Sequence, residues 1–358
     1  MSVARGIADP VLRERFNRMK HFARGVRSSE YHVTNACNIR CKGCWFFAHD
    51  FDGKTRDAHD LDDWRAFVRA ERARGVTLAI LIGGEPTLFP DRVKVFVDEM
   101  PHVWISTNGL RRLPVQGFEN VAVAVTLFGG GPLDDELRGY RPSGARVHDL
   151  FDTALRNYRH DRRAFFVYAL TAASLDYMEE VVNRVAGNGN ALIFNYYTDY
   201  DHPEQSAPRE RMLIDKAVAL HEKYPDTVLS HPYYIETLVS GRTEWASWGY
   251  DVCPSVSSDH PGNAARIANG NPTLPGFNAY APDLRTVNLC CTSGHCGSCR
   301  DSQAISSWLL VSPNHFRESE ERLALWLDIA ESFWSQFCWS PYNKTGRGQL
   351  EVYTNSPT

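Results

Sequence analysis

The sequence of 358 residues has no apolar run that approaches the roughly 20 residues of a membrane-spanning helix. Residues 1–25 are charged and rich in arginine, a composition that argues against a signal peptide. Lys and Arg number 39 against 43 Asp and Glu, and no basic stripe of the kind that contacts nucleic acid is present. We therefore expect a cytoplasmic protein with neither a nucleic-acid nor a membrane partner.

Cysteine is missing between Cys44 and Cys253, although the chain holds nine cysteines in all. Nine thiols in a cytoplasmic protein indicate metal or redox chemistry rather than disulfides. Cys338 stands alone, and the other eight form two groups. These groups are Cys37, Cys41 and Cys44, followed by Cys253, Cys290, Cys291, Cys296 and Cys299. The distribution predicts two separate metal centres.

The first group has the spacing C-x₃-C-x₂-C and follows an apolar, strand-like run. Three thiolates on one loop can ligate three irons of a cubane iron–sulfur cluster, which leaves the fourth iron open to a substrate or cofactor. A structural zinc site is the alternative, but zinc normally takes four protein ligands. A fourth ligand would have to come from elsewhere, and His32 and His49 lie nearby in the sequence.

This spacing resembles the signature loop of the radical S-adenosylmethionine (radical SAM) enzymes, in which the open iron chelates the amino and carboxylate groups of SAM. About forty residues later, the next strand runs into Gly83-Gly84-Glu85-Pro86. In the family, the matching G-G-E-P segment contacts the SAM amino group. Glycines also free a backbone for close approach to a ligand. The resemblance implies a 4Fe–4S cluster with an open iron, and SAM as cofactor.

Later strand ends extend the resemblance. It implies contacts to SAM from Ser106 and Asn108 of an S-T-N-G turn, although Asn-Gly alone also predicts a simple turn. Many family members carry S-L-D-G after the fourth strand, where this chain has Thr126-Leu127-Phe128-Gly129. Phe128 therefore replaces an acidic residue. Arg138 could orient a carboxylate through a bidentate pair or could cap a helix.

The fifth and sixth strand ends complete the expected SAM site. Thr171 and Ser174 stand where the family places polar contacts to SAM, and Asn195 stands where it flanks the adenine. Ser174 is also a candidate N-cap for a helix over 175–187. We expect substrate contacts in 197–204, including Asp201 and His202.

Short apolar runs alternate with amphipathic segments from residue 30 onward, which predicts right-handed βαβ units and a parallel sheet. An open doubly wound sheet is the alternative, but no G-x-G-x-x-G follows the first strand. The resemblance implies an α/β fold, a (β/α)6 partial TIM barrel. The predicted strands are 30–35, 77–82, 102–106, 121–127, 164–170 and 191–196, and the predicted helices are 60–74, 90–99, 146–159, 175–187 and 207–223.

Residues 251–301 are rich in Pro, Gly, Asn and Cys and show little helical periodicity. The segment resembles the SPASM and twitch extensions of radical SAM enzymes, although it departs from the SPASM order of seven cysteines. We predict one auxiliary 4Fe–4S cluster on Cys253, Cys296, Cys299 and either Cys290 or Cys291. A zinc ribbon is the alternative.

We expect three parts: an N-terminal helical segment (1–27), a radical SAM barrel (28–240) and an auxiliary-cluster extension (241–358). A helix over 317–338 ends at Cys338, which we expect to be buried, with a role as hydrogen-atom donor as the alternative.

The resemblance implies a radical SAM oxidoreductase, served by a flavodoxin or ferredoxin, that acts on a small molecule in specialised metabolism. Dehydrogenation, epimerisation and radical bond formation all remain open. Peptide maturation is the alternative within the family, but about thirty residues before the cysteine loop are too few for a leader-recognition module. An iron–sulfur electron carrier or a zinc-binding protein is the alternative from another class.

Overall fold

The computed structural model describes residues 7–48, 50–197, 209–241, 248, 253–289 and 300–337. Its centre is an eight-stranded sheet with the order β6-β5-β4-β3-β2-β1-β7-β8. Every neighbouring pair is parallel except β7 and β8. The strands are β1 (Ser28–His32), β2 (Leu78–Ile82), β3 (His102–Thr107), β4 (Val121–Leu127), β5 (Ala164–Leu170), β6 (Ala191–Tyr196), β7 (Ala279–Tyr280) and β8 (Val287–Asn288).

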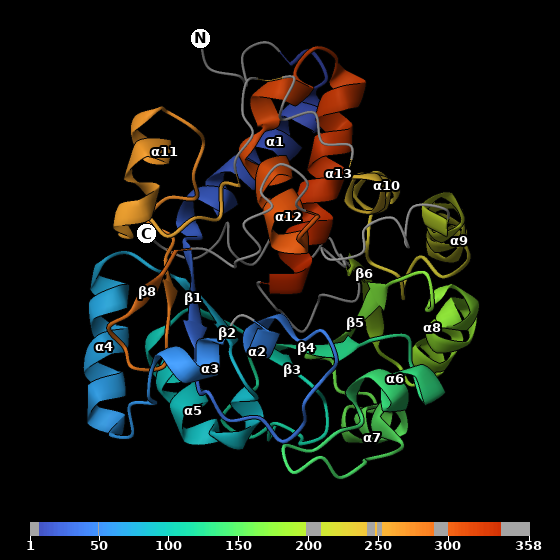
Figure 1. Ribbon diagram of the computed structural model, residues 1–358. Coiled ribbons are helices and arrows are strands. Elements are labelled where there is room, and N and C mark those ends of the chain that lie inside the picture. The colour runs from blue at the N-terminus through green and yellow to red at the C-terminus, as the bar shows by residue number, and fades with distance from the viewer. Residues whose placement is uncertain are drawn as a thin grey trace.

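Helices alternate with the first six strands and cover the outside of the curved sheet (Figure 1). Within the described ranges the sheet stays open, with β6 and β8 at its ends. This confirms the predicted α/β partial barrel. The helices are α1 (Pro10–Gly25), α2 (Trp45–Ala48), α3 (Phe51–Lys54), α4 (Leu61–Ala73), α5 (Pro90–Glu99), α6 (Gly131–Arg138), α7 (Leu150–Asn157), α8 (Met178–Gly187), α9 (Glu210–Lys223), α10 (Pro232–Ser240), α11 (Ala264–Ala268), α12 (Ser302–Val311) and α13 (Glu320–Phe337).

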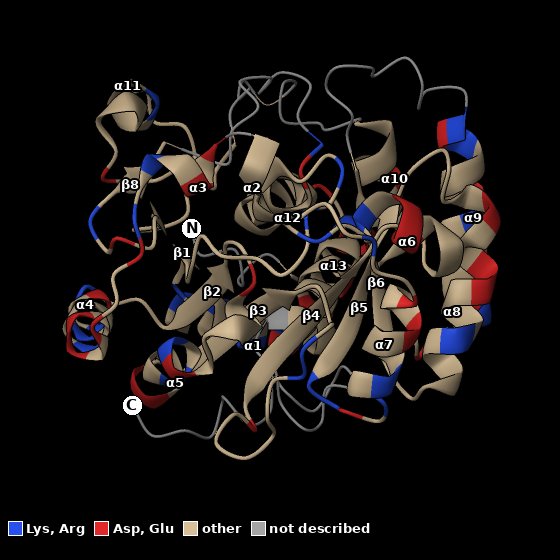
Figure 2. Ribbon diagram, turned by 60° about the horizontal axis from the view of Figure 1, so that its bottom comes forward, with Lys and Arg blue, Asp and Glu red and all other residues tan. Residues whose placement is uncertain are grey.

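The strands are apolar on both faces because both faces are buried. In β4, Val121, Val123 and Val125 join the large core, whereas Ala122 and Ala124 join a smaller one on the opposite face. Continuous apolar runs are typical of parallel strands that are covered on both sides. Figure 2 shows Lys, Arg, Asp and Glu along the outer helices α4, α8 and α9, while the strands carry almost no charge.

The C-terminal part of the chain joins the sheet beside its first strand. β7 pairs with β1, and the rings of Tyr31 and Tyr280 stack with centroids 5.8 Å apart. Both hydroxyls donate to the Glu71 carboxylate, at 2.7 and 3.2 Å. Arg74 pairs with the same carboxylate at 2.7 Å. Residues 279–288 therefore continue the sheet of the barrel.

One helix begins later than its sequence predicts. The pattern over 146–159 predicts a helix from residue 146, but α7 starts at Leu150. Asp149 has a left-handed backbone with φ of 58°, which ends any helix that approaches from the N-terminal side. The carboxylate of Asp135 accepts the backbone N–H groups of Asp149 and Leu150 at 2.8 and 3.0 Å, so it caps α7 from another segment.

Helices α12 and α13 pack together, and α13 also contacts α1 and β3. The Phe16 and Trp326 rings lie 6.1 Å apart, and Arg15 pairs with Glu331 at 2.7 Å. The predicted helix over 317–338 is confirmed as α13, whereas Cys338 lies outside the described residues. Across the part of the chain that is described, no helix is long and apolar enough to cross a membrane.

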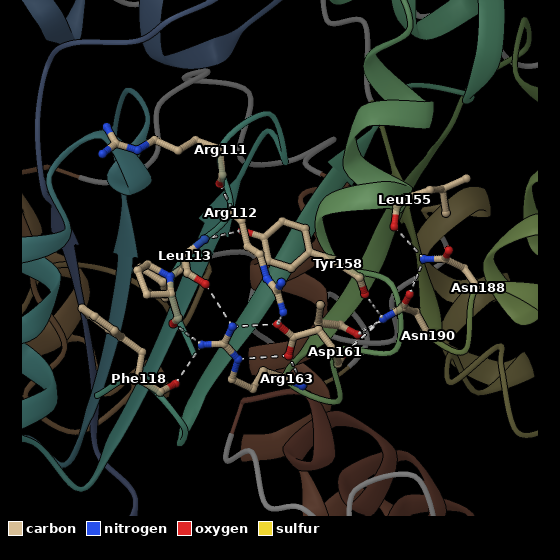
Figure 3. Close-up of polar contacts among 12 residues, drawn as sticks. Arg111, Arg112, Leu113, Phe118, Leu155, Tyr158, Asp161, Arg163, Asn188 and Asn190 are labelled. Atoms are coloured by element: carbon tan, nitrogen blue, oxygen red, sulfur yellow. Dashed lines mark hydrogen bonds and ion pairs between the residues drawn. The ribbon is translucent and has the colours of Figure 1, made fainter. Parts of the chain in front are cut away.

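A polar network closes the edge of the sheet at which β4 and β5 begin (Figure 3). The buried Arg163 guanidinium donates to the carbonyl oxygens of Leu113, Pro114 and Phe118 at 2.7–3.0 Å. It also pairs with Asp161 at 2.6 Å. The network lies at the opposite ends of the strands from the cysteine loop, so we assign it to stability.

Candidate metal and cofactor site

The cysteine loop leaves β1 through a segment that is held in place by buried charges. The Asp57 carboxylate accepts the Thr34 hydroxyl at 2.6 Å and the Asn35 backbone N–H at 2.9 Å. Arg92 donates to Asp57 and to the Val33 carbonyl, both at 2.7 Å. The backbone is therefore fixed immediately before Cys37.

The Gly83-Gly84 turn packs directly on this segment. The N–H of Gly84 donates to the Thr34 carbonyl at 2.8 Å, and that of Glu85 donates to the Ala36 carbonyl at 2.9 Å. Gly83 has φ of +119°, and a β-carbon there would lie 2.7 Å from the Thr34 oxygen. A β-carbon on Gly84 would collide with the Ala36 carbonyl. Only glycines allow this approach of two backbones.

Glu85 is fully buried and joins the ends of β2 and β3. Its carboxylate accepts the backbone N–H and hydroxyl of Thr87 at 3.0 and 2.6 Å. It also accepts the Thr107 hydroxyl at 2.7 Å and the Asn108 N–H at 2.8 Å. Burial raises the pKa of Glu85, and these hydrogen bonds oppose the shift. The buried Glu85 carboxylate therefore joins the two strand ends beside the cysteine loop. Pro86 begins a 3₁₀ turn.

Asn108 connects the end of β3 with the first cysteine. Its side-chain amide donates to the Asn38 side chain at 2.6 Å, and its Nδ2 lies 4.0 Å from the Cys37 sulfur. The side-chain oxygen accepts the Leu110 N–H at 3.0 Å, so the residue also forms the local turn expected of Asn-Gly. The simple-turn interpretation therefore has a structural counterpart, and a contact of Asn108 to SAM stays a prediction.

The far half of the loop is bound to the end of α6. The N–H of Arg40 donates to the Tyr140 carbonyl at 2.6 Å, and that of Lys42 donates to the Leu137 carbonyl at 2.7 Å. These two hydrogen bonds flank Cys41 on the cysteine loop and Arg138 at the end of α6. Cys41 and Arg138 are thus held opposite each other.

The Arg138 side chain points into the protein and is only 2% exposed. Its Nη1 pairs with Asp134 at 2.7 Å and donates to the Thr126 carbonyl, while Nη2 donates to the Asn108 carbonyl at 3.4 Å. Its charge lowers the pKa of Cys41 against the larger upward effect of burial. Arg138 therefore links two strand ends to the cysteine loop, a role different from the helix cap that the sequence allowed.

Tyr197 is a contact of the cysteine loop that sequence reasoning did not identify. It follows β6, and its hydroxyl donates to the Gly43 carbonyl at 3.0 Å. Its ring lies 5.8 Å from that of Phe128, which in turn lies 5.5 Å from the Arg138 guanidinium. The glycine directly before Cys44 indicates a local constraint, but it does not identify Tyr197 as the group that fills this space.

The remaining predicted SAM contacts lie along the same edge of the sheet. The Ser106 and Thr126 hydroxyls are 3.5 Å apart on neighbouring strands, and Asn195 lies near the end of β6. Ser174 does not cap the following helix through its side chain. Its hydroxyl instead accepts the Thr171 N–H at 2.9 Å and donates to the Thr171 carbonyl at 3.0 Å, which closes a tight loop.

The three thiols suit an iron–sulfur cluster by their chemistry and surroundings. Cys37, Cys41 and Cys44 are partly exposed on one loop whose backbone is held at both ends. Burial raises the pKa of all three thiols, that of Cys37 to about 12. Binding a metal would displace these protons. Within the described ranges, no group of three or more His, Cys, Asp or Glu side chains forms a ready-made site for a metal ion.

Most of the predicted second centre lies outside the described residues. Of its cysteines the structure describes Cys253, whose sulfur accepts the Ser255 N–H at 3.3 Å. The auxiliary cluster therefore stays a prediction. Further residues named in the sequence analysis also lie outside the description: Cys290, Cys291, Cys296, Cys299, His49, Asp201 and His202.

Comparison with curated proteins finds similarity to the GTP 3′,8-cyclase of Stenotrophomonas maltophilia (strain K279a). The two are 35% identical over 101 residues, which cover 26% of this chain and only 31% of the cyclase.

Comparison with solved structures finds distant similarities. SuiB of Streptococcus suis bound to S-adenosylmethionine aligns with a TM-score of 0.43 and 16% identity, over 59% of this chain and 52% of SuiB. The protein anSMEcpe, with bound AdoMet and Cp18Cys peptide, aligns with a TM-score of 0.47 and 12% identity, over 91% and 96% of the two chains.

The family model of the radical SAM superfamily matches residues 31–185. That range includes the cysteine loop, the Gly83–Glu85 turn and most of the barrel strands. Residues 31–185 therefore match the radical SAM superfamily domain.

Proposed function

We propose that the chain is a radical SAM enzyme whose first cluster is held by Cys37, Cys41 and Cys44. The observation that carries the proposal is the backbone contact between the Gly83–Glu85 turn and Thr34–Ala36. It sets the glycine turn directly against the loop that bears the thiols. A zinc site or a simple electron carrier requires the thiols but not this second backbone segment.

When bound, a reduced 4Fe–4S cluster supplies the electron that cleaves SAM into methionine and a 5′-deoxyadenosyl radical. The protein's part is orientation and exclusion of water. Asp57 and Arg92 fix the start of the loop, and Asn108 places an N–H group 4.0 Å from the Cys37 sulfur. The hydroxyls of Ser106 and Thr126 line the same edge of the sheet, where the adenosine and methionine parts of SAM are proposed to bind.

The test is formation of 5′-deoxyadenosine from SAM by the anaerobically reconstituted chain with a chemical reductant. We expect turnover by the native sequence and none by Cys41→Ala. Turnover no higher than in that variant would leave the electron carrier or zinc protein as the better explanation. A flavodoxin or ferredoxin is the proposed electron donor in the cell.

We further propose that the substrate is a small molecule and that the segment from Cys253 to Cys299 holds an auxiliary 4Fe–4S cluster. Such a cluster suits a reaction in which the substrate radical loses an electron, as in dehydrogenation or radical bond formation. Iron and sulfide near eight per chain would support two clusters, and about four would remain in a Cys37→Ala/Cys41→Ala/Cys44→Ala variant. A native content near four would remove the auxiliary cluster from the proposal. Maturation of a peptide is the alternative within the family.

A further inference from the structure

Two buried side chains with N–H donors lie beside the cysteine loop. Asn108 Nδ2 lies 4.0 Å from the Cys37 sulfur. Arg138 is held opposite Cys41 by the hydrogen bonds from the Arg40 and Lys42 N–H groups to the carbonyls of Tyr140 and Leu137. The two donors are coupled, because the Arg138 guanidinium also donates to the Asn108 carbonyl.

The donors of Arg138 are unequally used. Nη1 and Nη2 bind Asp134 and the carbonyl oxygens of Thr126 and Asn108. The Nε atom is fully buried, and among the described residues no atom accepts its proton in a hydrogen bond. An unpaired buried N–H is destabilising, so such groups are rare without a cause. The side chain nevertheless lies close enough to Cys41 for its charge to act on that sulfur.

We propose that Arg138 Nε donates a hydrogen bond to the Cys41 thiolate in the cluster-bound protein, and thereby raises the reduction potential of the cluster. The inference rests on the proposed function, because it requires the first cluster. A neutral thiol is a weak acceptor, whereas a metal-bound thiolate is a charged one. Arg138 Nε would then gain the Cys41 thiolate as its hydrogen-bond acceptor when the metal binds.

Reduction adds one negative charge to the cluster, and a nearby cation with an N–H···S bond stabilises that charge. Hydrogen bonds to cluster sulfurs and local charge are recognised determinants of iron–sulfur potentials. Asp134 balances the guanidinium charge when the site holds neutral thiols. Arg138 is therefore a positioning residue that acts through the cluster, without contact to the substrate.

The test is a redox titration of the reconstituted full chain. It is monitored through the EPR signal that is absent in Cys41→Ala. Arg138→Gln removes the charge, and Arg138→Lys keeps the charge but removes Nε. We expect both variants to bind iron and to shift the midpoint potential to more negative values, with the larger shift in Arg138→Gln. Arg146→Gln is the matched control, because that exposed guanidinium lies over Tyr140 on the neighbouring segment. Its potential should equal that of the native chain.

An unchanged potential in a cluster-loaded Arg138 variant would overturn the inference and leave the proposed function intact. If both Arg138 variants fail to hold iron, the inference is tested on the native chain instead. Arginine labelled with ¹⁵N should show a nitrogen coupling to the reduced cluster in pulsed EPR, and an exchangeable proton should disappear in D₂O. Absence of both signals would overturn the inference, and failure of the native chain to bind iron would overturn the proposed function with it.

Discussion

The hydroxyl of Tyr197 lies in the space that a β-carbon on Gly43 would occupy. It also donates to the Gly43 carbonyl at 3.0 Å, so the end of β6 is joined to the residue before Cys44. Gly43 itself has φ of +67°, a region that disfavours residues with a β-carbon. Position, conformation and contact together require glycine here.

Gly43→Ala is therefore expected to disturb the cysteine loop. The alanine would collide with Tyr197 and would strain the backbone, so we expect reduced iron incorporation and a lower free energy of unfolding. Iron analysis after reconstitution and thermal unfolding measure the two effects.

Gly144→Ala provides the matched control for backbone strain alone. Gly144 has φ of +83°, but among the described residues no atom beyond its chain neighbours lies within 4 Å of the β-carbon position. We expect a loss of about 1 kcal/mol in stability and normal iron content. If both variants bind iron equally well, the contact with Tyr197 does not hold the loop. Tyr197→Phe in the Gly43→Ala background should restore part of the lost iron.

Arg163→Met is expected to weaken the fold without affecting the first metal site. The substitution leaves the Asp161 carboxylate buried without its main partner and frees three backbone carbonyls (Figure 3). Loss of one member of a buried ion pair costs about 3–5 kcal/mol. Urea unfolding would measure the loss.

The neighbouring Arg112 supplies a control for that measurement. Its side chain is 49% exposed and lies 3.7 Å from the same carboxylate. Exposed pairs contribute about 1 kcal/mol or less, so Arg112→Met should change stability little. Equal effects of the two substitutions would contradict the role given to the buried network.

His102 is expected to make stability depend on pH. Burial lowers its pKa from 6.5 to about 4. Below pH 6.5 the unfolded chain binds a proton that the folded protein does not, so the free energy of unfolding falls as the pH drops toward 4. The full effect is about 3 kcal/mol.

His102→Gln should remove this part of the pH dependence, measured by urea unfolding between pH 4 and 7. A residual dependence in the same direction is expected, because burial also lowers the pKa of His231. An unaltered slope in His102→Gln would contradict the prediction.

The sequence predicts the barrel well because its signals are local. Alternation of apolar and amphipathic runs locates β4, β5 and β6 at their observed bounds, and α5 as well. Helix α6 was not predicted, since its eight residues begin at glycine and proline. The start of α7 was misplaced because its cap, Asp135, comes from a different segment.

The site residues likewise divide into those that a local sequence pattern identifies and those that depend on contacts between distant segments. Cys37, Cys41 and Cys44 are recognisable from spacing alone, and the following glycine turn from its place after the next strand. The inward course of Arg138 depends on acceptors up to 30 residues away, and Tyr197 lies 154 residues from Gly43 in the sequence. No local pattern encodes these contacts. The packing of Gly84 on Ala36 is likewise invisible before the chain folds.

The central claim is that Cys37, Cys41 and Cys44 hold a cluster whose fourth iron binds SAM. The most direct test is pulsed EPR of the reduced chain with SAM labelled by ¹⁵N at its amino group. We predict a nitrogen hyperfine coupling to the cluster that is absent in Cys41→Ala. A fully loaded cluster that shows no such coupling, with SAM in excess, would contradict the account.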